Sequence, residues 1–76
     1  MSAHGLRDLL DRLVAEMLKG GITLDEGRQA FEARLIEWAL DAADGHLGQA
    51  AQQLGIHRNT LTRKMSEYHI RATPKR

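Results

Sequence analysis

The sequence has no cysteine and only one proline, and each scarcity excludes a class of structure. Without cysteine, the 76-residue chain forms no disulfide, iron–sulfur cluster or cysteine-based zinc site, which fits a reducing compartment. Pro74 lies at the extreme C-terminus, so no proline interrupts a helix before it. No apolar run is long enough to cross a membrane, and the N-terminus lacks the basic and apolar regions of a signal peptide. We therefore expect one small domain, residues 1–76, in the cytoplasm.

The charged residues divide the chain into an acidic part and a basic part, although the net charge is only +1. Residues 1–45 carry five basic and nine acidic side chains, and residues 46–56 carry neither kind. Residues 57–76 carry six basic side chains against the single acidic Glu67. A basic end of this kind indicates an anionic partner, with a solvated basic tail as the alternative.

Apolar residues recur at the three- and four-residue spacing of helices along most of the chain. The spacing predicts an all-α fold of four helices, over residues 5–19, 24–43, 47–54 and 58–68. Gly20 and Gly21 would end the first helix, because glycine adopts the left-handed conformation at a helix C-terminus at little cost. Thr23 and Glu26 have the spacing of a capping box, which would begin the second helix.

The second predicted helix is apolar on more than one side, with Phe31, Leu35, Ile36 and Leu40 among its residues. A helix that is apolar nearly all round is buried on more than one side. We expect the additional side to contact a second copy of the chain, with burial by the short C-terminal helices alone as the alternative. Trp38 is expected in the core or the dimer interface, and not on a nucleic-acid base.

Residues 45–68 have the pattern of a helix-turn-helix, in which two short helices meet at a tight turn. Ala50 and Ala51 are small enough to let the helices cross closely, and Gly55 suits the turn between them. Arg58 falls in the first turn of the second helix, where a guanidinium can pair with O6 and N7 of guanine. The pattern predicts a recognition helix in the major groove of DNA, although helical hairpins of other function share part of it.

The same segment combines a glycine, paired alanines, Leu-Gly-Ile, an arginine, Thr-Leu, a lysine, a leucine position and a tyrosine. The residues are Gly45, Ala50, Ala51, Leu54, Gly55, Ile56, Arg58, Thr60, Leu61, Lys64, Met65 (in place of leucine) and Tyr68. This sequence strongly resembles the DNA-binding region of the bacterial Fis family, which the C-terminal domains of NtrC-type activators share. Residues 5–44 match the two preceding Fis helices by pattern more than by identity.

The resemblance implies an intertwined homodimer in which residues 5–44 dimerise, residues 45–70 form the helix-turn-helix and residues 71–76 form a basic tail. It also implies binding and bending of double-stranded DNA by a transcription regulator or nucleoid-associated protein. The resemblance implies asparagine at position 46, a hydroxyl residue at position 48 and asparagine or serine at position 57, where this chain has His46, Gly48 and His57. Phosphate contacts at the first two positions and base reading at the third are therefore expected to differ here. His57 is expected to increase DNA affinity in mildly acidic solution by becoming a cation.

Eight residues form the predicted DNA-binding site. Arg58 is expected to read a base, with His57 as a second reader. The expected phosphate contacts are Thr60, Thr62, Arg63 and Lys64, with His46 and Arg71 as outlying contacts.

No catalytic, metal or cofactor site is predicted. The chain has no nucleophile–base–orienter set and no glycine-rich phosphate loop, so we expect neither an enzyme nor a small-molecule substrate. The histidines are too far apart in sequence to form a metal-binding pair on one helix face. They are His4, His46, His57 and His69.

Two other functions are compatible with the sequence. One is the detached C-terminal domain of an NtrC-type activator, although Met1 and the basic end favour a free-standing protein. The other is a helical dimerisation module that binds a protein through the apolar stripe from Leu6 to Leu18. The second alternative predicts salt-insensitive binding of a partner and no affinity for DNA.

Overall fold

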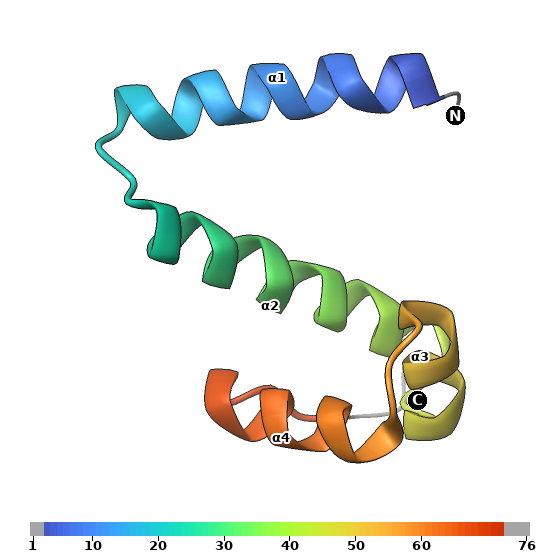
Figure 1. Cartoon of the computed structure of the whole chain (residues 1–76). Coiled ribbons are helices and arrows are strands. Elements are labelled where there is room, and N and C mark those ends of the chain that lie inside the picture. Colours follow the sequence, from blue (N-terminus) through green and yellow to red (C-terminus); the bar gives the residue numbers. More distant parts are fainter. Residues whose placement is uncertain (1–2, 73–76) are drawn as a thin grey trace.

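The computed structural model describes residues 3–72, and the side chains of residues 5–72. The described chain forms four α-helices and no strand, which confirms the predicted all-α class (Figure 1). The helices are α1 (Ala3–Lys19), α2 (Leu24–Ala42), α3 (Leu47–Leu54) and α4 (Arg58–Tyr68). The small differences from the predicted bounds of α1 and α2 are typical of fraying helix ends. The predicted basic tail lies outside the described residues after Ala72.

A glycine turn and a capping box separate α1 from α2, as the sequence predicts. Gly21 has a φ of 74°, and the Ile22 N–H donates to the Met17 carbonyl at 3.0 Å, which closes the end of α1. Thr23 Oγ1 accepts the Glu26 N–H at 3.2 Å, and Glu26 Oε1 accepts the Thr23 N–H at 3.0 Å. The N–H groups of Thr23 and Glu26 are therefore both satisfied by side chains.

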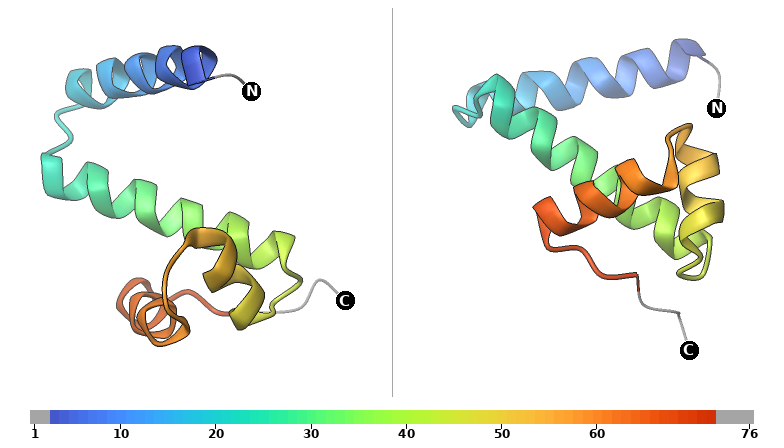
Figure 2. Two further views of the ribbon diagram at one scale, coloured as in Figure 1. Left: turned by 45° about the vertical axis from the view of Figure 1, so that its right-hand side comes forward. Right: turned by 60° about the horizontal axis from the view of Figure 1, so that its bottom comes forward.

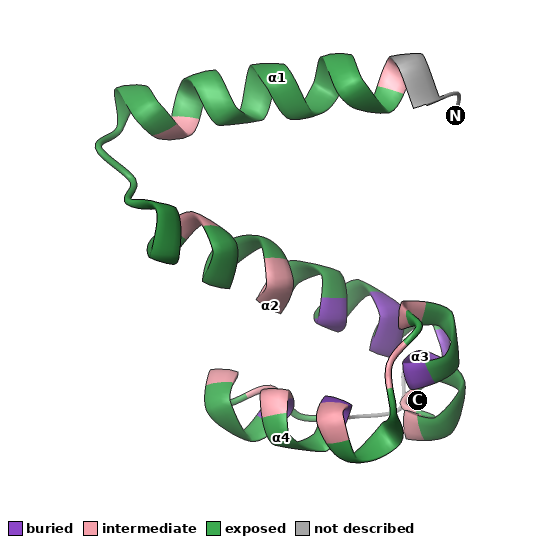
Figure 3. Ribbon diagram, in the orientation of Figure 1, coloured by how far each residue is buried: buried purple, intermediate pink, exposed green. Residues whose placement is uncertain are grey.

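The buried core lies where the second half of α2 meets α3 and α4 (Figure 3). Its members are Ile36, Ala39, Leu40, Ala43, Ala50, Ala51, Leu61 and Met65. Leu61 is fully buried, with 0 % of its surface exposed, and none of the described polar or charged residues is buried. Because half of these residues are alanines, the helices approach closely over a small core.

Among its described side chains, α1 contributes none to this core, and it diverges from α2 after the turn between them (Figures 1 and 2). Large apolar side chains of α1, the turn and α2 are exposed: Leu6, Leu9, Leu10, Leu13, Val14, Leu18, Ile22, Leu24, Phe31, Leu35 and Trp38. Trp38 is 73 % exposed, so it lies outside the core of its own chain. The short C-terminal helices therefore cover one side of α2 and leave a second apolar surface exposed.

Candidate nucleic-acid interface

Gly55 forms the turn that connects α3 to α4. Its φ of 71° lies in the left-handed region, and an added Cβ would meet no atom within 4 Å beyond its chain neighbours. The backbone conformation therefore favours glycine here. Close packing does not require glycine, because a side chain would have room. The Ile56 N–H donates to the Ala51 carbonyl at 3.0 Å and completes the turn. The result is a helix-turn-helix in which α4 starts at the surface with exposed Arg58.

His57 caps the N-terminus of α4 with its side chain. Its Nδ1 accepts the backbone N–H of Asn59 at 3.0 Å, so in this geometry Nδ1 carries no proton and the ring N–H lies on Nε2. The exposed imidazole therefore places a donor at the start of α4.

The accessible face of α4 carries polar side chains in its first turns. Leu61 and Met65 bury the other face in the core. Arg58, Thr62 and Arg63 are exposed, and Thr62 Oγ1 donates to the Arg58 carbonyl at 3.1 Å. Arg58 and Thr62 are one helical turn apart and therefore lie on the same side of α4. Two of the predicted DNA contacts thus share one side of α4, and Arg63 is exposed on a neighbouring part of the helix surface.

Lys64 lies on a different side of α4 and contacts α2. Its Nζ is 2.8 Å from Oε1 of Glu32, and the Tyr68 hydroxyl donates to the same oxygen at 2.6 Å. The side chains of Lys64 and Glu32 are only 24 % and 27 % exposed. The hydrogen bond from Lys64 lowers the pKa of Glu32 most, and the hydrogen bond from Tyr68 lowers it further. The hydrogen bond to Glu32 in turn raises the pKa of Tyr68. A phosphate contact by Lys64 would therefore use an N–H of its ammonium that Glu32 does not accept.

The remaining predicted contacts are dispersed. Thr60 is half-buried in α4, and His46 is the exposed N-cap of α3, where its side chain makes no capping hydrogen bond. Arg71 is exposed beyond α4 and lines a surface hollow together with Glu37 and Asp41 of α2. The structure therefore gathers the predicted contacts most closely around the first two turns of α4.

Two residues at or beside this region are not among the predicted contacts. Asn59 is exposed in the first turn of α4, and an asparagine amide can pair with N6 and N7 of adenine. A helical wheel places Asn59 opposite Leu61, so the sequence contained a signal for it. Glu32 is the other residue. It lies 32 positions from Lys64 in the chain, so no local spacing indicates their contact.

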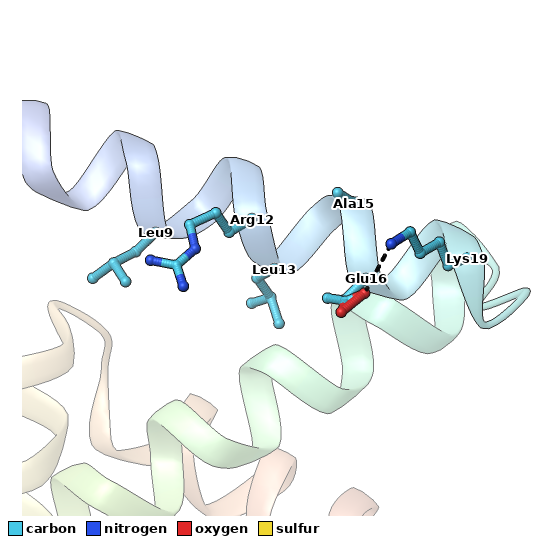
Figure 4. Close-up of a pocket in the computed structure, with 6 residues that line it drawn as sticks. All are labelled: Leu9, Arg12, Leu13, Ala15, Glu16 and Lys19. Atoms are coloured by element: carbon cyan, nitrogen blue, oxygen red, sulfur yellow. Dashed lines mark ion pairs between the residues drawn. The ribbon is translucent and has the colours of Figure 1, made fainter.

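The hollow on α1 is another surface feature with charged lining residues (Figure 4). It is lined by Leu9, Arg12, Leu13, Ala15, Glu16 and Lys19. One helix supplies all of this lining and cannot enclose a ligand.

Among the described residues, no group of three or more metal-ligating side chains is arranged to hold an ion, and His4 lies outside the described side chains. No helix in the described part of the chain combines the length and apolar character needed to span a membrane.

Comparison with known proteins relates the helix-turn-helix to bacterial regulators. The family described as "Bacterial regulatory protein, Fis family" matches residues 27–68, which is more than half of the chain and ends with α4. The nitrogen fixation protein AnfA of Azotobacter vinelandii is 42 % identical over 50 residues, a match that covers 66 % of this chain and 9 % of AnfA. The chain thus spans less than a tenth of that relative's length, and no solved structure matches it. By its sequence from α2 to α4, this chain belongs to the Fis family of bacterial regulatory proteins.

Proposed function

We propose that this protein is a homodimeric transcription regulator that places α4 of each subunit in the major groove of double-stranded DNA. The observation that carries the proposal is a helix-turn-helix whose second helix buries one face in the core and exposes Arg58, Asn59 and Arg63. An α-helix fits the major groove, and nearby cations attract phosphates. Membership in a family of bacterial regulatory proteins supports the same role.

In this proposal the start of α4 reads bases. Arg58 donates two hydrogen bonds to a guanine, and Asn59 is placed to recognise an adenine. His57 offers its Nε2–H to a base or phosphate oxygen, since Nδ1 is occupied by the cap. Base contacts by these neighbouring side chains would give the protein its direct sequence preference.

Phosphate contacts would hold α4 in register along the groove. Arg63 supplies an exposed cation. Thr62 would have to turn its hydroxyl proton from the Arg58 carbonyl to donate to a phosphate oxygen. The further contacts in the proposal are Thr60, His46 and Arg71, and Lys64 through an N–H of its ammonium that Glu32 does not accept.

The proposed dimer rests on the apolar surface that one chain leaves exposed. A groove of about 350 Å³ between α1 and α2 is lined by Leu10, Leu13, Val14, Met17, Leu18, Ile22, Thr23, Leu24, Gly27, Arg28 and Phe31. Extended apolar surfaces of soluble proteins mark interaction sites. Two-fold symmetry would match this surface with the same surface of a second copy. The family resemblance implies that the two copies intertwine through these helices.

Bending of DNA belongs to the same proposal. Successive major grooves on one face of straight DNA are about 34 Å apart. The resemblance implies two recognition helices that lie closer together than this distance, so the duplex must curve to meet both. The cost of bending depends on sequence, and we expect a preference for a narrow minor groove between the half-sites.

A second candidate is that this unit acts as the DNA-binding part of a longer activator. The match to AnfA favours it, because the matching segment is only 9 % of that protein. An immunoblot of the native source with an antibody against this unit would separate the two candidates. A band near 8.5 kDa would support a free-standing regulator, and a several-fold larger band would support the longer activator.

The proposed function is tested by fluorescence anisotropy with a labelled, A/T-centred duplex of about 27 base pairs, long enough for two half-sites. Titrations at about 50 and 200 mM salt should give tight binding that weakens steeply, with each phosphate contact adding about 0.9 to the log–log slope. Absence of binding at the lower salt by a folded dimer would contradict the proposal. It would favour a helical module that binds another protein.

Arg58→Ala is the variant that tests base reading. It should weaken binding to the preferred duplex by about 1–3 kcal/mol and flatten the sequence preference, because a bidentate base contact is lost. Arg63→Ala is the matched control: it removes the same charge from the same helix, and it should weaken all sequences alike while lowering the salt slope by about 0.9. An intact sequence preference in Arg58→Ala would show that another residue reads the base.

A further inference from the structure

We infer that Glu32 is a positioning residue that fixes the orientation of α4 on α2 and thereby sets the half-site spacing that the dimer accepts. The inference rests on the proposed function, since it concerns how two copies of α4 meet one duplex. It starts from a single carboxylate oxygen of α2 that binds two side chains of α4.

The contact holds α4 at two points along its length. Glu32 Oε1 accepts hydrogen bonds from Lys64 Nζ at 2.8 Å and from Tyr68 Oη at 2.6 Å. Lys64 and Tyr68 are four residues apart, so they lie one turn apart on the same side of α4. One attachment would leave α4 free to pivot, whereas two attachments restrict both pivoting and rotation about the helix axis.

The apolar contacts between these helices do not restrict rotation in the same way. They are made within the apolar core, where Leu61 and Met65 of α4 pack with Ile36 and Leu40 of α2. Apolar burial is non-directional, whereas a hydrogen bond depends on distance and angle. The hydrogen bonds to Glu32 therefore affect the orientation of the exposed side chains at the start of α4 more strongly than the area that Glu32 buries would suggest.

Glu32 also lies in the part of α2 that the proposed dimer would use. Its neighbours Phe31 and Leu35 are exposed apolar residues, while Glu32 itself is half-buried against α4. The same two turns of α2 therefore carry apolar surface for a partner and the carboxylate that holds α4. In a dimer, this arrangement links the position of the two-fold interface to the position of each recognition helix.

Two variants and one control distinguish a positioning role of Glu32 from an effect of its charge. Tyr68→Phe removes one of the two hydrogen bonds without changing any charge at neutral pH. Glu32→Gln keeps the size of the side chain and removes its charge. Glu37→Gln is the control, because it removes the same charge from α2 at a residue that pairs with Arg34 of its own helix, at 3.8 Å.

The measurement is the affinity for duplexes whose half-site centres differ in one-base-pair steps. The wild-type protein and Glu37→Gln should bind the best half-site spacing about tenfold more tightly than the neighbouring spacings. The reason is that α4 reaches a misplaced half-site only if the DNA is deformed. Tyr68→Phe and Glu32→Gln should reduce this ratio to about threefold or less. Circular dichroism melting verifies that each variant is folded.

Two outcomes would overturn the inference. One is a folded Tyr68→Phe protein with the wild-type spacing ratio. The other is a Glu32→Gln protein that binds all spacings more tightly by the same factor, with a salt slope higher by about 0.9. That second result would mean that Glu32 withholds the Lys64 cation from phosphate and does not position α4.

A DNA-free measurement distinguishes this failure from a failure of the proposed function. The chain has no cysteine, so spin labels can be attached specifically to Arg34→Cys on α2 and Ser66→Cys on α4. Excess unlabelled chain leaves one labelled copy in each dimer. The α2–α4 distance distribution should broaden in Tyr68→Phe and Glu32→Gln. An unchanged distribution contradicts the positioning role alone, whereas a wild-type protein that binds no duplex contradicts the proposed function and the role assigned to Glu32 in it.

Discussion

His57 uses its two ring nitrogens for different purposes. Nδ1 accepts the Asn59 N–H at 3.0 Å and caps α4, while Nε2–H is left for DNA in the proposed complex. The asparagine or serine that the family resemblance implies at this position can also cap a helix, so the substitution keeps the capping role. In the proposed complex, it changes the group that faces DNA from an amide or hydroxyl to an imidazole N–H.

The capping role of His57 can be measured without DNA. His57→Ala should lower the free energy of unfolding by about 1 kcal/mol, because the Asn59 N–H loses its side-chain acceptor. His57→Asn should stay close to the wild type, since asparagine is among the best N-caps. Urea denaturation at neutral pH and fixed protein concentration measures both variants. Equal stability of all three proteins would show that the cap contributes nothing to folding.

Glu32 makes stability depend on pH in a defined direction. Its hydrogen bonds, from Lys64 and then Tyr68, lower its pKa in the folded chain below the ordinary value of 4.5. The folded protein therefore binds fewer protons than the unfolded chain in moderately acidic solution. This stabilisation is fully present above the unfolded pKa and is lost as the pH falls through the folded pKa.

Glu32→Gln should therefore be less stable than the wild type at neutral pH, and the difference should shrink as the pH falls below about 4.5. Urea denaturation at a series of pH values measures this difference. Glu37→Gln serves as the reference for loss of an α2 carboxylate without loss of the contact to α4. A difference between wild type and Glu32→Gln that is independent of pH would contradict the assigned ion pair.

At the scale of helices, the elements that depend on local chemistry could be predicted from the sequence. The capping box at Thr23 and Glu26, the glycine end of α1 and the left-handed Gly55 are set by residues within a few positions of each other. The four helices follow from the spacing of their apolar residues. These features need no knowledge of which helix packs on which.

Features that depend on packing could not be predicted in the same way. The sequence indicated apolar residues on two sides of α2, but it did not indicate that α3 and α4 cover Ile36 and Leu40 while Trp38 stays exposed. It assigned Lys64 to phosphate because Lys64 lies on a basic helix. The contact with Glu32 depends on how α4 crosses α2, which no pattern along one helix contains.

Two glycines of the helix-turn-helix should respond in opposite directions to alanine. Gly55→Ala should cost about 1–2 kcal/mol of folding free energy, because alanine is strained at a φ of 71°. Gly48→Ala should stabilise the fold by up to about 1 kcal/mol, since Gly48 lies within α3 and its added Cβ would meet open space. Thermal or urea denaturation tests both. Destabilisation by Gly48→Ala would mean that the site lacks the space that the structure shows.

At the scale of the whole molecule, α1 differs from the other helices because none of its described side chains is buried. Isolated helices of this length are marginal in water, and most helix stability in proteins comes from packing of an apolar face. The exposed stripe of α1 therefore favours assembly with another surface, which the proposed function assigns to a second copy. Stability in that case depends on protein concentration.

Leu13→Glu should weaken the dimer by at least tenfold, because it would bury a carboxylate in the proposed interface. Ala15→Glu is the matched control, since it introduces the same charge on the opposite side of α1. Sedimentation equilibrium measures the dimer dissociation constant, and the melting temperature of the wild type should rise with concentration. Equal dimerisation of both variants would place the interface elsewhere.

The confinement of the core to Ile36–Met65 also has a consequence for how such a protein can change over evolution. A gene fusion that replaced α1 with a different N-terminal segment would remove none of the buried side chains that hold α3 and α4 in place. The segment from α2 to α4 can therefore be inherited as one piece and attached to different N-terminal segments. The 42 % identity to 9 % of a much longer protein is the relationship expected of a transferable unit of this kind.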